Sequence, residues 1–218
     1  MKRLTAVQLK KEQEQTLKTP RRKYSLLAKL LFITMDIFYG RKATLKKFKV
    51  LEIIARMPYQ AWENVSYVAI THTFRKREFT RRIFDRVKES RIQQDNEQWH
   101  LLIIEEQLQE EGVHQGFIRF WLIPQIIAFV YYFVSWLLYV INPKLSYTLN
   151  ADFEDHAEHE YMNFVRDNPE LAKKPFKSMF EKDYGKFASL ADLYRQIGYD
   201  ERLHKEESIA RLSEPRFS

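Results

Sequence analysis

Cysteine is absent from the 218 residues, and glycine, with 5 residues, and proline, with 7, are scarce. The absence of cysteine excludes disulfides, iron–sulfur clusters and thiol-based redox control. Any metal would then be held by histidine and carboxylate ligands, which suit iron or manganese. Few glycines and prolines among many Leu, Ile, Glu, Lys and Arg residues favour helices over strands, so the expected fold class is all-α.

The polar beginning of the chain lacks the apolar core of a secretory signal. Glu12 and Glu14 also argue against a transit peptide. We therefore expect residues 1–22 to form a flexible basic arm and residues 23–218 to form a single domain.

The net charge is +7, and nucleic acid is one class of partner for a basic protein. The sequence contains no zinc finger, RNA-binding sheet signature or basic repeat, however. Its 16 Phe, 12 Tyr and 4 Trp are concentrated in apolar runs. A basic protein with such runs fits an anionic membrane surface better, so we expect a membrane partner and no nucleic acid.

Two apolar segments are candidates for that membrane contact. Residues 24–39 carry one Lys and one Asp and are short for a membrane span. Residues 121–141 carry no charged residue and are long enough to span. Pro124 and Gln125 interrupt the start of this second segment, and its Trp and Tyr residues are typical of membrane interfaces. We favour a helix that lies in one leaflet over one that spans.

The rest of the chain predicts four further helices, separated by glycine- and proline-containing connections. They are expected at residues 44–74, 76–110, 145–166 and 187–212. Pro58 is expected to kink the first of them, because proline removes a backbone hydrogen bond. Residues 170–186 read as a polar connection.

A Glu-x-x-His motif recurs on these helices, and its two side chains share one helix face. It occurs at Glu97–His100, Glu111–His114 and Glu201–His204. The first and third pairs lie inside predicted helices. The second flanks Gly112 at a helix end and is interpreted as solvated.

Two more glutamates complete a pattern. Glu52 lies among apolar neighbours, where a carboxylate is costly unless it is paired or coordinates a metal. Glu154 and Glu158 share a face of the next predicted helix, and the spacing does not choose between them. The order Glu, Glu-x-x-His, Glu, Glu-x-x-His on four helices is the ligand pattern of ferritin-like di-iron carboxylate bundles. Tyr161 returns to the face of Glu154, either as core packing or as a redox-active phenol near the metals.

The segments LEIIARMPY, NEQWHLLIIEEQ, EDHAEHEY and DERLH occur in this order and resemble the alternative oxidase family. The likeness is nearest to the plastid terminal oxidase branch, the plastoquinol oxidases, and runs from about Tyr24 to Leu212. It implies a ferritin-like four-helix bundle that holds a di-iron site, with two additional apolar helices forming a membrane-binding face. The implied ligands of the two iron ions are Glu52, Glu97, His100, Glu154, Glu201 and His204.

The resemblance also implies residues around the metals and at the quinol. Positions that surround the ligands in the family correspond to Asn96, Tyr139, Tyr161 and Asp200, of which Asn96, Tyr161 and Asp200 are expected to act in catalysis. Lys47, Leu51 and Ala157 are expected to contact the quinol. Three positions depart from the family pattern, which usually has Arg near Lys47, His at Tyr67 and Thr at Glu160, and these departures bear on quinol binding.

The implied function is oxidation of plastoquinol or a similar quinol with reduction of O2 to water, without proton pumping. A di-iron quinone-ring hydroxylase is the enzyme alternative, and a helical membrane-binding protein is the non-enzyme alternative. We expect a monotopic protein at the thylakoid or cytoplasmic membrane of a photosynthetic bacterium. The resemblance leaves a homodimer through the long helices open.

Overall fold

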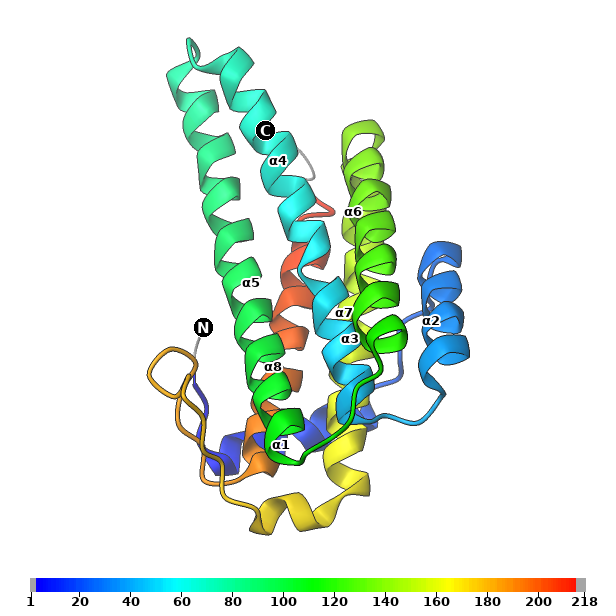
Figure 1. Ribbon diagram of the computed structural model, residues 1–218. Coiled ribbons are helices and arrows are strands. Elements are labelled where there is room, and N and C mark those ends of the chain that lie inside the picture. Colours follow the sequence, from blue (N-terminus) through cyan, green and yellow to red (C-terminus); the bar gives the residue numbers. More distant parts are fainter. Residues whose placement is uncertain (1–2, 215–218) are drawn as a thin grey trace.

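The structure is a computed structural model that describes residues 3–214, and all regular structure in that range is helical (Figure 1). The all-α prediction is therefore confirmed. The α-helices are α1 (Ala6–Lys18), α2 (Leu26–Tyr39), α3 (Leu45–Ala55), α4 (Met57–Thr73), α5 (Arg77–Glu110), α6 (Ile123–Ile141), α7 (Pro143–Asp167) and α8 (Leu190–Ala210). A π-helical turn, Ile118–Leu122, leads into α6, and a 3₁₀-helix, Pro169–Lys173, follows α7.

The helix expected over residues 44–74 is divided in two at Pro58. Helix α3 ends at Ala55 and α4 begins at Met57, with Arg56 between them. Proline lacks the N–H of a helical residue, and its ring collides with the carbonyl four residues earlier. The break therefore falls about one helical turn after Glu52.

Helices α3, α4, α5, α7 and α8 form the bundle, with the closest packing between α7 and α8 and between α4 and α5. Figure 1 shows that α4 and α5 extend together beyond α8, while α2 stands to one side of the bundle. One buried apolar cluster joins α5, α7 and α8 and includes Ile104, Leu193 and Ile197. A second cluster joins α2, α3, α6 and α7 and includes Ile54 and Phe153.

The prediction of a flexible arm over residues 1–22 is wrong for residues 6–18, which form α1. Thr5 and Gln8 cap this helix reciprocally, as in a capping box. Leu9 is buried, and the Gln13 side chain donates to the carbonyl of Met162, 2.9 Å away. Helix α1 thus docks on α7 and α8 largely through polar groups, which is why its composition resembled that of a free arm.

The contact between α2 and α7 contains a partly buried histidine. The His156 ring stacks on Phe32, with 4.0 Å between ring centroids. Arg21 Nη1 lies 3.0 Å from His156 Nδ1. Because arginine only donates, the ring accepts at Nδ1 and is neutral. Burial lowers the pKa of His156 from 6.5 to about 3, and the charges on Arg21 and Lys47 add to this effect.

This histidine makes the fold sensitive to acid. As pH falls from about 6.5 to about 3, the unfolded chain takes up a proton that folded His156 does not, so the free energy of unfolding decreases. The loss approaches about 1.4 kcal/mol per pH unit. We expect His156→Gln to lose about 2 kcal/mol less than the wild type between about pH 7 and about pH 5, measured by urea unfolding. Parallel stability curves for the two proteins would contradict this.

Candidate metal centre

Six polar side chains meet in the middle of the bundle, and none is more than 1% exposed. Glu52 comes from α3, Glu97 and His100 from α5, Glu154 from α7, and Glu201 and His204 from α8. They form two overlapping groups of four. The first holds Glu52, Glu97, His100 and Glu201, and the second holds Glu97, Glu154, Glu201 and His204, with candidate ligand atoms within 4.8 Å of one another in each group.

Glu97 and Glu201 belong to both groups, and each faces the histidine of the other Glu-x-x-His helix. His204 Nδ1 lies 2.5 Å from Glu97 Oε1. His100 Nδ1 lies 3.1 Å from Glu201 Oε1 and 3.4 Å from Glu52 Oε2. Two metal ions could therefore each take one imidazole nitrogen, and Glu97 and Glu201 could contribute to holding both.

The donor set fits two divalent cations. Among the described residues, most buried side-chain nitrogen and oxygen atoms without a hydrogen-bond partner belong to these six residues. They include both carboxylate oxygens of Glu97 and Glu201 and both ring nitrogens of His100 and His204. The ion pairs recorded for these glutamates involve only the two histidines. When all four buried carboxylates are ionised, they carry four negative charges, which two divalent ions would neutralise.

Protonation of the metal-free site agrees with this reading. Burial, reinforced by repulsion from Glu201, raises the pKa of both Glu52 and Glu154 well above the ordinary carboxyl range. Burial acts to lower the pKa of His204, but the adjacent Glu97 and Glu201 outweigh it and raise the pKa. Without metal the site therefore holds protons, which bound cations would displace.

Two tyrosines donate to the carboxylates on the α3 and α7 side. The Tyr161 hydroxyl donates to Glu52 Oε1. The Tyr59 hydroxyl donates to Glu154 Oε1 at 2.6 Å and accepts from the Asn150 side chain at 2.9 Å. Sequence reasoning missed Tyr59 and Asn150. Tyr59 lies seven residues after Glu52, the same spacing that drew attention to Tyr161, but Pro58 intervenes and hid the signal.

Asp200 lies behind His100. Its Oδ2 is 3.5 Å from His100 Nε2, the ring nitrogen opposite the one that faces the glutamates. The same oxygen accepts from the Tyr184 hydroxyl at 2.9 Å and from Asn96 Nδ2 at 3.4 Å. A carboxylate in this place orients a metal-bound histidine and increases its basicity. The hydroxyl of Tyr139 lies instead 3.2 Å from that of Tyr147.

The residues expected at the quinol are buried. Lys47 Nζ lies 2.7 Å from Asp36 Oδ1 and donates to the Gly40 carbonyl at 2.9 Å, so it holds the end of α2. Leu51 and Ala157 lie in the apolar cluster between α2, α3, α6 and α7. Of the two other departures, Glu160 pairs with Arg21, and Tyr67 is exposed on α4.

Sequence reasoning also missed a cavity of about 160 Å³ that reaches two of the candidate ligands. Its lining is Glu52, Ile53, Arg56, Met57, Glu97, Gln98, Leu101 and Gln125. Arg56, the residue at the helix break, donates to Gln98 at 2.5 Å across this cavity. Arg56, between α3 and α4, thus places a cation at the edge of the cavity that reaches Glu52 and Glu97.

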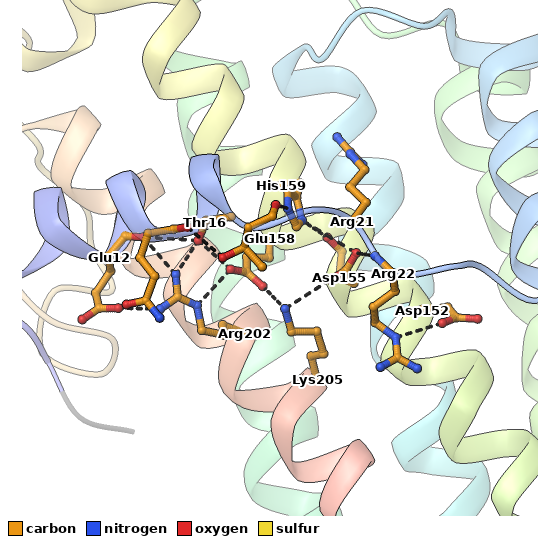
Figure 2. A network of polar contacts seen from close by, with 12 residues as sticks. Glu12, Thr16, Arg21, Arg22, Asp152, Asp155, Glu158, His159, Arg202 and Lys205 are labelled. Atoms are coloured by element: carbon orange, nitrogen blue, oxygen red, sulfur yellow. Dashed lines mark hydrogen bonds and ion pairs between the residues drawn. The ribbon is translucent and has the colours of Figure 1, made fainter.

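A third acidic group, Asp155 with Glu158 and His159, has residue types that suit a metal. Figure 2 shows it within a network that already contains cations. Lys205 Nζ lies 2.5 Å from Glu158 and 3.2 Å from Asp155, and Arg202 donates to Glu158 at 2.9 Å. Glu158 therefore belongs to an ion-pair network that joins α7 and α8, while Glu154 faces the buried centre.

A helical bundle with four buried glutamates and two histidines, paired through two Glu-x-x-His helices, belongs to the ferritin-like carboxylate class. The family model described as alternative oxidase matches residues 1–210, so the chain belongs to the alternative oxidase family, as its motifs predicted. The chain is 34% identical over 151 residues to ubiquinol oxidase 4, chloroplastic/chromoplastic, of Arabidopsis thaliana. That alignment covers 69% of this chain and 40% of the relative.

Proposed function

We propose that this chain oxidises a quinol and reduces O2 to water at a di-iron centre held by the six residues. The buried set of four glutamates and two histidines in a member of the alternative oxidase family is the observation that carries the proposal. Two bound iron ions would supply the one-electron and oxygen chemistry. The chain itself supplies the ligands, the tyrosine donors Tyr59 and Tyr161, and the exclusion of bulk water.

An apolar groove between α2 and α6 supports a quinol as the substrate. Its volume is about 420 Å³. The groove is lined by Leu27, Leu30, Leu31, Thr34, Phe38, Ile123, Ile126, Ile127, Val130, Tyr131, Val134 and Leu149. The Tyr131 hydroxyl is buried and has no hydrogen-bond partner among the described residues. Tyr131 shares an apolar cluster with Leu51 and Ala157. A quinol whose isoprenoid tail lies in the groove would therefore have its ring directed toward those two residues and Lys47.

Exposed apolar side chains on α2 and α6 support a membrane-binding face. They include Leu26, Leu30, Ile33 and Ile37 on α2, and Ile126, Phe129, Phe133 and Leu137 on α6. Among the described residues, the stretch Ile118–Ile141 is long and apolar enough to cross a membrane. We propose that it lies in one leaflet, in line with its interfacial aromatic residues. A protein in one leaflet offers no path for pumped protons.

Charges placed on this face are expected to release the protein from membranes. The double variant Leu30→Asp/Phe129→Asp should bind vesicles with anionic lipids at least about tenfold more weakly than the wild type. Each substitution removes apolar surface that enters the lipid. Co-flotation with vesicles measures this. Val7→Asp is a matched control, since Val7 is 79% exposed but lies on α1. Equal flotation of all three proteins would refute the proposed face.

Oxygen uptake tests the function directly. Membranes that contain the protein should consume O2 with decyl-plastoquinol in the presence of cyanide, and two quinols should be oxidised per O2. Recovery of a ring-hydroxylated quinone as the product would favour the hydroxylase function over the oxidase function. Protein that contains no iron and shows no oxygen uptake would favour the non-enzyme alternative, a helical membrane-binding protein.

The identity of the quinol and the membrane belong to the same proposal. The Arabidopsis relative is named a ubiquinol oxidase of the chloroplast. Its plastid location supports a plastid-type membrane system for this chain, and we propose plastoquinol from the likeness of the chain's motifs to the plastid branch. The thylakoid or cytoplasmic membrane of a photosynthetic bacterium, and the homodimer, remain predictions. Rates with plastoquinol and ubiquinol analogues compared on one preparation would decide the substrate.

A further inference from the structure

We propose that Arg3 tunes the metal centre electrostatically through Asp200 and His100, and so keeps the reduction potential of the bound metals high. The inference rests on the metal centre of the proposed function. Arg3 Nη1 donates to Asp200 Oδ2 at 3.2 Å. The Asp200 side chain is completely buried, whereas that of Arg3 is 30% exposed. Arg3 therefore links the surface to the carboxylate behind His100.

The Arg3 side chain packs in a defined position. The Arg3 guanidinium lies over the Tyr184 ring, 4.0 Å from its centroid. Gly185 has a φ of +133°, and a Cβ there would lie 3.1 Å from Arg3 Nε, so glycine leaves the space that Arg3 occupies. The backbone is fixed as well, because the Leu4 N–H donates to Gln196 Oε1 at 3.1 Å.

Those same neighbours bind Asp200. Tyr184 donates its hydroxyl to Asp200 Oδ2, the oxygen that Arg3 contacts, and Gln196 Nε2 donates to Asp200 Oδ1 at 2.9 Å. The carboxylate thus accepts from Arg3, Tyr184, Gln196 and Asn96, while its Oδ2 lies 3.5 Å from His100 Nε2. Of these four donors, Arg3 is the one that carries a charge.

The direction of the effect follows from that charge. A carboxylate that accepts from a metal-bound imidazole makes the imidazole a stronger electron donor, which favours the oxidised metal. Arg3 draws electron density from the same carboxylate oxygen and weakens this donation. Its positive charge also directly disfavours the more positive oxidised metals. Both effects raise the reduction potential, so removal of Arg3 should lower it.

Arg3→Gln tests this, with Lys11→Gln as a control for net charge, since Lys11 is exposed on α1. We expect the iron-loaded Arg3→Gln protein to titrate at a more negative potential in an EPR-monitored redox titration. Its quinol turnover should fall about tenfold, with an unchanged KM. Arg3→Lys keeps the charge and should restore most of the potential, whereas Lys11→Gln should match the wild type.

An unchanged potential in Arg3→Gln, with iron bound, would overturn the role of Arg3 and leave the proposed function intact. Equal shifts in Arg3→Gln and Lys11→Gln would assign the effect to net charge and would also overturn it. Wild-type protein that binds no iron would overturn the metal centre and this inference together.

Discussion

Glu97→Ala is expected to lose both iron binding and quinol-dependent oxygen uptake. Glu97 belongs to both groups of candidate ligands, so its removal affects both metal positions at once. Among the described residues, its oxygens face the two histidines of the cluster, with Oε1 2.5 Å from His204 Nδ1 and Oε2 3.5 Å from His100 Nδ1. We expect no neighbouring carboxylate to replace it, because Glu52, Glu154 and Glu201 are themselves members of the two groups of candidate ligands. Iron content by mass spectrometry and oxygen uptake on one preparation measure the two losses.

The third Glu-x-x-His pair provides the matched control. Glu111 and His114 repeat the motif, but the Glu111 side chain is 44% exposed and lies 3.8 Å from Lys174. Glu111→Ala should therefore keep the iron and the turnover of the wild type. Circular dichroism should show equal helix content in both variants. Iron retained by Glu97→Ala, or lost equally by Glu111→Ala, would show that the buried cluster is not the metal site.

These two pairs show what local sequence could and could not decide. Identical residue types at identical spacing occur in the core and at a helix end, and helix position separated them before the fold was known. Periodicity likewise located the helices that carry the ligands, because each buries a regular apolar stripe. The spacing alone did not choose between Glu154 and Glu158, and the family resemblance was what indicated Glu154. Both lie on α7, but only Glu158 meets the cations of α8.

Helix α1 shows why the remainder was hidden. Its stabilising partners lie far away in the chain, as when Arg202 contacts Glu12 at 2.5 Å (Figure 2). Polar residues that pair with one another lack the apolar stripe on which helix prediction depends. The same reasoning applies to Arg3. Its partner Asp200 directly precedes the candidate ligand Glu201 in the sequence, but it is far from Arg3 in the sequence. Long-range charge pairing leaves no local pattern in the sequence.

Tyr161→Phe is expected to retain iron but to lose turnover about a hundredfold or more. Tyr161 is fully buried, and its ring stacks on Phe48 with 4.1 Å between centroids. Phenylalanine preserves that stack and removes only the hydroxyl that donates to Glu52 Oε1. Glu52, a candidate ligand, then loses the hydroxyl donor that Tyr161 provides, and the centre loses a phenol placed to hold or move a proton there. Steady-state kinetics should show an unchanged KM for quinol and a reduced kcat.

Tyr194 separates this chemical role from packing. It is also buried on the same side of the bundle, and its ring lies 6.4 Å from that of Tyr161. Its hydroxyl has no hydrogen-bond partner among the described residues, so Tyr194→Phe removes a buried oxygen without removing a contact to a ligand. We expect Tyr194→Phe to turn over like the wild type. Full activity in Tyr161→Phe, or the same loss in both variants, would mean that Tyr161 acts only as a core residue, because the two substitutions differ chiefly in the bond to Glu52.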